Sequence, residues 1–113
     1  MDFYEFENAV ASTAIYPESG EGTLTALNYT VLGLAGEAGE ILNKVKKVYR
    51  DKGGVLSIED RAAISKELGD VLWYAARAAA ELGYTLEEVA EYNVEKLRDR
   101  QVRGVLAGTG DDR

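Results

Sequence analysis

Apolar residues recur at helical spacing in four segments of the chain, and turn-forming residues separate these segments. Pro17 and the pair Gly53-Gly54 each interrupt the pattern. Ser57 and Thr85 are each followed three residues later by an acidic residue, as in a capping box at a helix start. We therefore predict helices from about Asp2 to Ile15, Thr23 to Arg50, Ser57 to Leu82, and Thr85 to Arg103.

Four helices joined by short loops predict an all-α fold resembling a four-helix bundle. The 113 residues are enough for one domain, spanning 1–113, with a polar, glycine-bearing tail at 104–113 that we expect to be flexible. The apolar residues of the first helix, Phe3, Phe6, Val10 and Ile15, are expected in the core. A chain this small with long, Ala-rich helices gains much by association, so we expect a homo-oligomer, either a dimer or a tetramer.

The composition of the chain limits the partners and the metal ligands that it can have. The net charge of −7 argues against nucleic acid as a partner, and no apolar run is long enough to cross a membrane. The start of the chain does not resemble a signal peptide and there is no Cys, which favours a cytoplasmic location. Since His is also absent, a metal site has only oxygen ligands available, which favours Mg²⁺ or, as a substitute, Mn²⁺.

Two acidic pairs lie on the second and third predicted helices. Glu37 and Glu40 are three residues apart, as are Glu67 and Asp70, so each pair shares one helix face. Both pairs fall on the same flank of their helix's apolar stripe. Packed antiparallel, the two helices would bring four carboxylates around one cleft, and cations would be needed to offset their repulsion. The alternative is that both are ordinary solvated surface pairs.

Three blocks of sequence resemble the all-α nucleotide pyrophosphohydrolases, and the MazG-like proteins among them most of all. The resemblance runs from about Leu27 to Gly104. Its specific parts are Gly33-Leu34-Ala35-Gly36-Glu37-Ala38-Gly39-Glu40, Glu67-Leu68-Gly69-Asp70-Val71-Leu72-Trp73-Tyr74 and Asn93-x-x-Lys96-Leu97-x-x-Arg100.

The resemblance implies that Glu37, Glu40, Glu67 and Asp70 are the catalytic residues and hold Mg²⁺. A metal-activated water would then cleave a nucleoside triphosphate to the monophosphate and pyrophosphate, and a dNTP is the expected substrate. This reaction requires mainly positioning and charge neutralisation, for which neither His nor Cys is needed. Phosphoribosyl-ATP pyrophosphohydrolysis is an alternative, as is a non-catalytic helical oligomer that binds a nucleotide or a protein.

Five further residues are candidates for substrate binding. The family block implies that Lys96 and Arg100 grip phosphate oxygens and that Asn93 touches substrate or a metal-site carboxylate. The alternative is that Asn93 caps a neighbouring backbone and that the two cations pair with Glu81, Glu91 or Asp99. Lys44 suits a salt bridge and a phosphate contact equally. Tyr74, one turn after Asp70, would line the nucleotide pocket, whereas a helix contact and base stacking are equally open for Trp73.

Overall fold

The computed structural model describes residues 1–113 and contains four helices and no strands. The four helices and the absence of strands confirm the predicted all-α class. None of the helices is both long and apolar enough to span a membrane. The helices are α1 (Phe3–Ser12), α2 (Leu24–Lys52), α3 (Ile58–Glu81) and α4 (Leu86–Arg103).

Local capping explains most of the helix boundaries. Ser57 forms a capping box with Asp60 at the start of α3, and Thr85 forms one with Glu88 at the start of α4. Gly53 ends α2 in the left-handed conformation, with φ of 60°. The first helix ends at Ser12, with Thr13 as its C-cap, and is therefore shorter than predicted.

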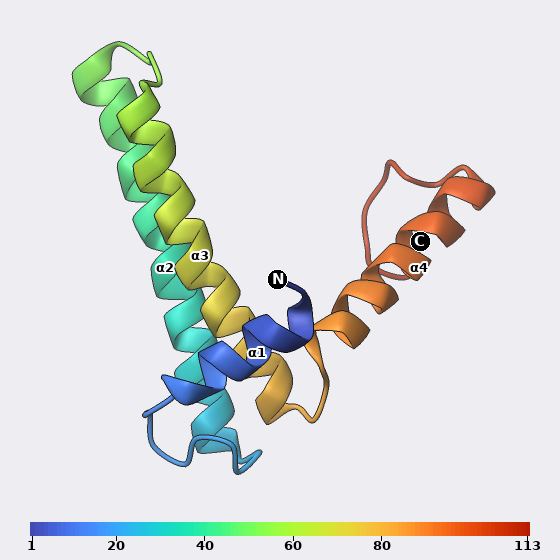
Figure 1. Cartoon of the computed structure of the whole chain (residues 1–113). Coiled ribbons are helices and arrows are strands. Elements are labelled where there is room, and N and C mark those ends of the chain that lie inside the picture. The colour runs from blue at the N-terminus through green and yellow to red at the C-terminus, as the bar shows by residue number, and fades with distance from the viewer.

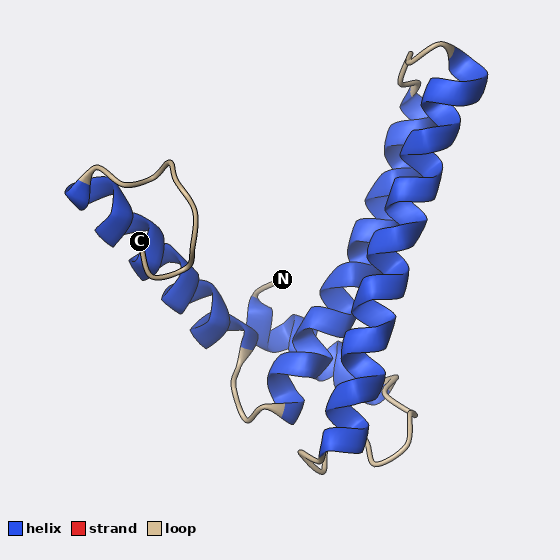
Figure 2. Cartoon of the chain, turned by 180° about the vertical axis from the view of Figure 1, so that it is seen from behind, coloured by secondary structure: helices blue, strands red, loops and turns tan.

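Helices α2 and α3 form a long antiparallel hairpin, and α1 crosses α3 near the end of the hairpin that holds the α3 C-terminus (Figures 1 and 2). Helix α4 leaves in a different direction and contacts α1 and α3 but not α2. The carboxylate of Glu7 in α1 accepts a hydrogen bond from the N–H of Leu86, which holds the first turn of α4 against α1. Within one chain, the helices form a hairpin with two attached helices rather than a closed bundle.

The buried core is small and lies where α1, α3 and α4 meet. It consists of Val10, Ala76 and Leu86, with Phe6 and Trp73 packed against it. Our expectation for the first helix was wrong at its ends. Ile15 lies beyond the end of α1 and is 94% exposed, and Phe3, in the first turn of α1, is 43% exposed.

The predicted apolar stripe of α3 is only partly buried. Leu68 and Leu82 lie on this stripe, yet they are 51% and 57% exposed. The buried side chains of α3 gather in its last two turns, where α1 covers the helix, and they include Ala76 and Ala79. Much apolar surface on the hairpin is therefore uncovered in the single chain.

Candidate metal centre

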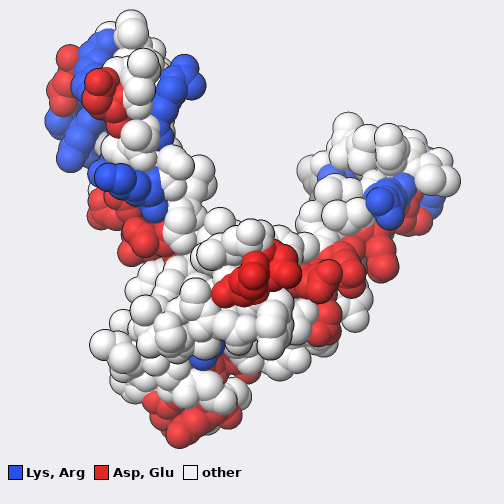
Figure 3. All heavy atoms as spheres, in the orientation of Figure 1, with Lys and Arg blue, Asp and Glu red and all other residues white.

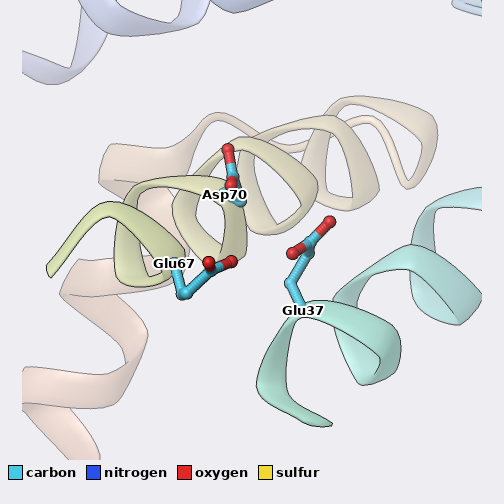
Figure 4. A group of neighbouring side chains, drawn as sticks. All are labelled: Glu37, Glu67 and Asp70. Atoms are coloured by element: carbon cyan, nitrogen blue, oxygen red, sulfur yellow. The ribbon is translucent and has the colours of Figure 1, made fainter. Parts of the chain in front are cut away.

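Three carboxylates from the hairpin converge at one point. Glu37 projects from α2 towards Glu67 and Asp70 of α3 (Figure 4). One oxygen from each carboxylate lies within 4.8 Å of the others, a spacing that allows all three to hold one metal ion. The i, i+3 spacing places Glu67 and Asp70 on the same face of α3, and the antiparallel pairing brings Glu37 opposite them.

Mutual repulsion is evident at Glu37. Its pKa is raised from the ordinary value of 4.5, first by burial and then by the negative charges of Asp70, Glu67 and Glu40. A divalent cation relieves such repulsion, and Mg²⁺ and Mn²⁺ prefer oxygen ligands. The donor set therefore fits a hard cation.

Glu40 lies outside this group of three. It is exposed on α2 one turn beyond Glu37, and its charge contributes to the raised pKa of Glu37. Three of the four predicted carboxylates thus meet directly, while a ligand role for Glu40 stays a prediction.

Lys44 contacts the centre from α2. Its Nζ lies 3.3 Å from Oε1 of Glu67, whose side chain is only 19% exposed. The salt bridge that we considered for Lys44 is therefore present, and the phosphate contact stays a prediction. Lys44 also borders a groove of about 290 Å³ between α2 and α3, which Lys47 and Lys52 line as well. Figure 3 shows basic side chains gathered towards this end of the hairpin.

Tyr74 packs over a glycine of α2 beside the carboxylates. A Cβ at Gly33 would lie only 2.1 Å from Cε1 of the Tyr74 ring, so this glycine makes room for the ring. The pKa of Tyr74 is raised by burial first, then by Tyr29 and by the charge of Glu37. Tyr74 therefore borders the carboxylate cluster, as its position one turn after Asp70 predicts. Gly36 and Gly39, in contrast, face open space.

Trp73 makes a contact between helices. Its Nε1 donates a hydrogen bond of 2.9 Å to Oγ1 of Thr13, just after α1, and its ring meets Tyr16 edge-on. Of the two roles left open for Trp73, the structure contains the helix contact.

The α4 candidates lie away from the carboxylates of their own chain, on a helix that does not contact α2. Lys96 and Arg100 pair with Asp111 of the tail, at 2.9 and 3.1 Å, and Asn93 is exposed. Their partner is thus none of the three acids that we considered. Of those acids, Glu81 pairs with Arg77 and Asp99 pairs with Arg103.

The sequence reasoning missed a buried polar network that anchors the loop before α2. The fully buried carboxylate of Glu81 accepts hydrogen bonds from the hydroxyl of Tyr16 and the N–H groups of Gly20 and Gly22, at 2.6, 2.6 and 2.9 Å. Burial alone would raise the pKa of Glu81, but these hydrogen bonds and Arg77 lower it overall. The signal in the sequence is an Arg and a Glu four residues apart among alanines.

The same network continues towards the carboxylates through aromatic rings. Tyr16 stacks on Tyr29 with ring centroids 4.9 Å apart, and Tyr29 lies 6.5 Å from Tyr74. Tyr29 is 44% exposed, so part of this residue is open to solvent. A chain of aromatic contacts therefore connects the candidate metal centre to the anchored loop.

Comparison with known proteins agrees with the geometry. The family model described as the MazG nucleotide pyrophosphohydrolase domain matches residues 26–104. A relative from Mycobacterium phage L5, named Gene 37 protein, is 47% identical over 114 residues, which cover 100% of this chain and 98% of the relative. No solved structure matches.

Proposed function

Because the chain belongs to the MazG nucleotide pyrophosphohydrolase family, we propose that it is a Mg²⁺-dependent enzyme that cleaves a nucleoside triphosphate, preferably a dNTP, to the monophosphate and pyrophosphate. The observation that carries this proposal is the convergence of Glu37, Glu67 and Asp70, whose oxygens lie within 4.8 Å of one another. Mn²⁺ is the expected substitute, since it shares the preference for oxygen ligands.

In this proposal the three carboxylates hold the cation, and Glu40 assists from the next turn of α2. A bound cation supplies charge neutralisation for the phosphate oxygens and activates a water. Lys44 adds positive charge at the groove that Lys47 also lines, and there it can meet phosphate oxygens, although Asp51 and Asp60 lie in the same groove. Tyr74 lines the site on the opposite side, along the hairpin axis towards Tyr29, and excludes water from the nucleotide there.

We also propose that the working enzyme is a homo-oligomer. The chain exposes 7942 Å² of surface, whereas a compact monomer of this mass is expected to expose about 6,100 Å². The difference is of the order of a protein–protein interface. Since α4 does not reach the carboxylates of its own hairpin, a second copy is the natural way to bring Asn93, Lys96 and Arg100 to the site.

The test is incubation of the protein with Mg²⁺ and a panel of dNTPs, NTPs and phosphoribosyl-ATP, with separation of monophosphate, pyrophosphate and phosphate. We expect monophosphate and pyrophosphate in equal amounts and the fastest turnover on a dNTP. Glu67→Gln should abolish turnover while the helical circular dichroism is retained. Glu59→Gln, an exposed glutamate in the first turn of the same helix, is the matched control and should retain activity.

Release of phosphate alone, or no turnover on any substrate, would contradict the proposal. Turnover confined to phosphoribosyl-ATP would reassign the substrate within the same reaction class. Full activity of Glu67→Gln would remove that residue from the metal centre.

A further inference from the structure

The segment after α4 turns back and lies along that helix (Figure 1). Three glycines in left-handed conformations, Gly104, Gly108 and Gly110 with φ of 71°, 116° and 86°, allow the chain to reverse. The reversal places Asp111 beside the basic residues in the second half of α4.

The Asp111 carboxylate takes the position of an anion between two α4 cations. Its Oδ1 lies 2.9 Å from Nζ of Lys96 and 3.1 Å from Nη2 of Arg100. Arg103 adds a hydrogen bond of 2.6 Å from its Nη2 to the backbone oxygen of Arg113. The hydrogen bond from Lys96, followed by that from Arg100, lowers the pKa of Asp111, so this carboxyl is ionised at neutral pH.

Arg100 is not fully satisfied by this contact. Its side chain is only 7% exposed, and its Nε is buried without a hydrogen-bond partner. A buried donor without a partner is costly. A phosphate group has more acceptor oxygens than a carboxylate and matches the planar fork of a guanidinium, so it would use the spare donor.

The tail contact also has the properties of one that can be displaced. The Asp111 side chain is 79% exposed and that of Lys96 is 40% exposed, and ion pairs at such positions are weak. The two hydrogen bonds made by the Arg113 guanidinium end within the tail itself, on the backbone oxygens of Gly110 and Leu106. The hydrogen bonds from helix to tail all have basic donors: Lys96 and Arg100 bond to the Asp111 carboxylate, and Arg100 and Arg103 bond to the backbone oxygens of Asp111 and Arg113.

We propose that the tail is an internal competitor for the phosphate-binding cations: Asp111 occupies Lys96 and Arg100, and a triphosphate must displace residues 105–113 to reach them. The proposal rests on the proposed function, in which these two cations bind phosphate. Competition follows because the same Nζ and Nη2 atoms serve both anions.

The test compares Asp111→Asn with Asp112→Asn in the full chain. Both variants remove one negative charge from the tail, but the Asp112 side chain makes no hydrogen bond or ion pair, so its variant controls for net charge. We expect Asp111→Asn to lower the KM for the preferred dNTP by about fivefold, because one weak ion-pair contact no longer has to be broken. The kcat should be unchanged, and Asp112→Asn should behave as the wild type.

A second measurement does not depend on turnover. Calorimetric titration with inorganic tripolyphosphate in the presence of EDTA measures anion binding by the α4 cations. The EDTA keeps divalent metal away from the carboxylates. Asp111→Asn should bind tripolyphosphate about fivefold more tightly than Asp112→Asn. Adding Lys96→Gln to Asp111→Asn should remove this gain.

Equal KM and equal tripolyphosphate affinity for Asp111→Asn and Asp112→Asn would overturn the tail proposal, whatever the enzyme hydrolyses. If no variant turns over any nucleotide while the gain in tripolyphosphate affinity persists, the tail contact stands and the proposed function fails.

Discussion

At the scale of single residues, the site depends on close packing beside the carboxylates as much as on the carboxylates themselves. Gly33 is the clearest case, because the Tyr74 ring occupies the space that any Cβ at this position would fill. The ring is thereby held against α2, next to Glu37. A glycine in a helix interior costs about 1 kcal/mol relative to alanine, and here the cost has a structural reason.

Gly33→Ala should destabilise the protein by about 1–3 kcal/mol, because the added methyl overlaps the Tyr74 ring. Its matched control is Gly36→Ala, one turn further along α2, where nothing lies within 4 Å of the added atom. The control should be neutral or stabilising by up to about 1 kcal/mol. Urea unfolding followed by circular dichroism measures both. Equal stability of the two variants would contradict the packing role of Gly33.

At the scale of elements, the sequence predicted what is decided locally. The capping residues Ser57 and Thr85 and the glycines at 53 and 54 fix helix ends through contacts a few residues apart, so most boundaries were found within a few residues. The pairing of Glu37 with Glu67 and Asp70 was also accessible, because helical spacing and one antiparallel contact suffice to bring them together.

The direction of α4, in contrast, could not be predicted from the sequence. It depends on long-range contacts such as the one between Glu7 and the N–H of Leu86, which no local pattern reveals. The partner of Lys96 and Arg100 was missed for the same reason, since the tail returns to α4 only through three successive glycine turns. The burial of the apolar stripe on α3 could not be predicted either, because other helices of the same chain cover only part of it.

The uncovered helix faces lead to a prediction about association. Leu32 and Leu42 on α2 are 64% and 70% exposed, and Leu97 on α4 is 44% exposed. Exposed apolar surface on this scale is typical of an interface. We expect sedimentation equilibrium to give a mass two or four times the 12.3 kDa of one chain. We expect Leu97→Gln to weaken the association. Glu91→Gln, a polar change on the same helix, should leave it intact. A wild-type chain that stays at 12.3 kDa at all concentrations would refute the oligomer.

At the scale of the whole molecule, the chain is extended and acidic. Its radius of gyration is 16.9 Å, against about 13 Å for a compact domain of this length. The net charge of −7 is spread over a surface on which basic side chains gather towards one end of the hairpin, whereas acidic side chains line much of α4 and basic ones lie only near its far end (Figure 3). A polyphosphate approaching such an acidic protein is repelled by its carboxylates unless a bound cation offsets their charge.

The proposed activity requires that Glu37, Glu67 and Asp70 bind a cation, and calorimetric titration of the protein with Mn²⁺ at pH 7 tests this binding most directly. We expect saturable binding that Glu37→Gln weakens by about tenfold or more, while Glu59→Gln leaves it unchanged. The affinity should fall as the pH is lowered towards 5, because the raised pKa of Glu37 lets protons compete with the metal. Absence of binding to the wild type, or equal affinity of the wild type and Glu37→Gln, would contradict a metal centre at these carboxylates.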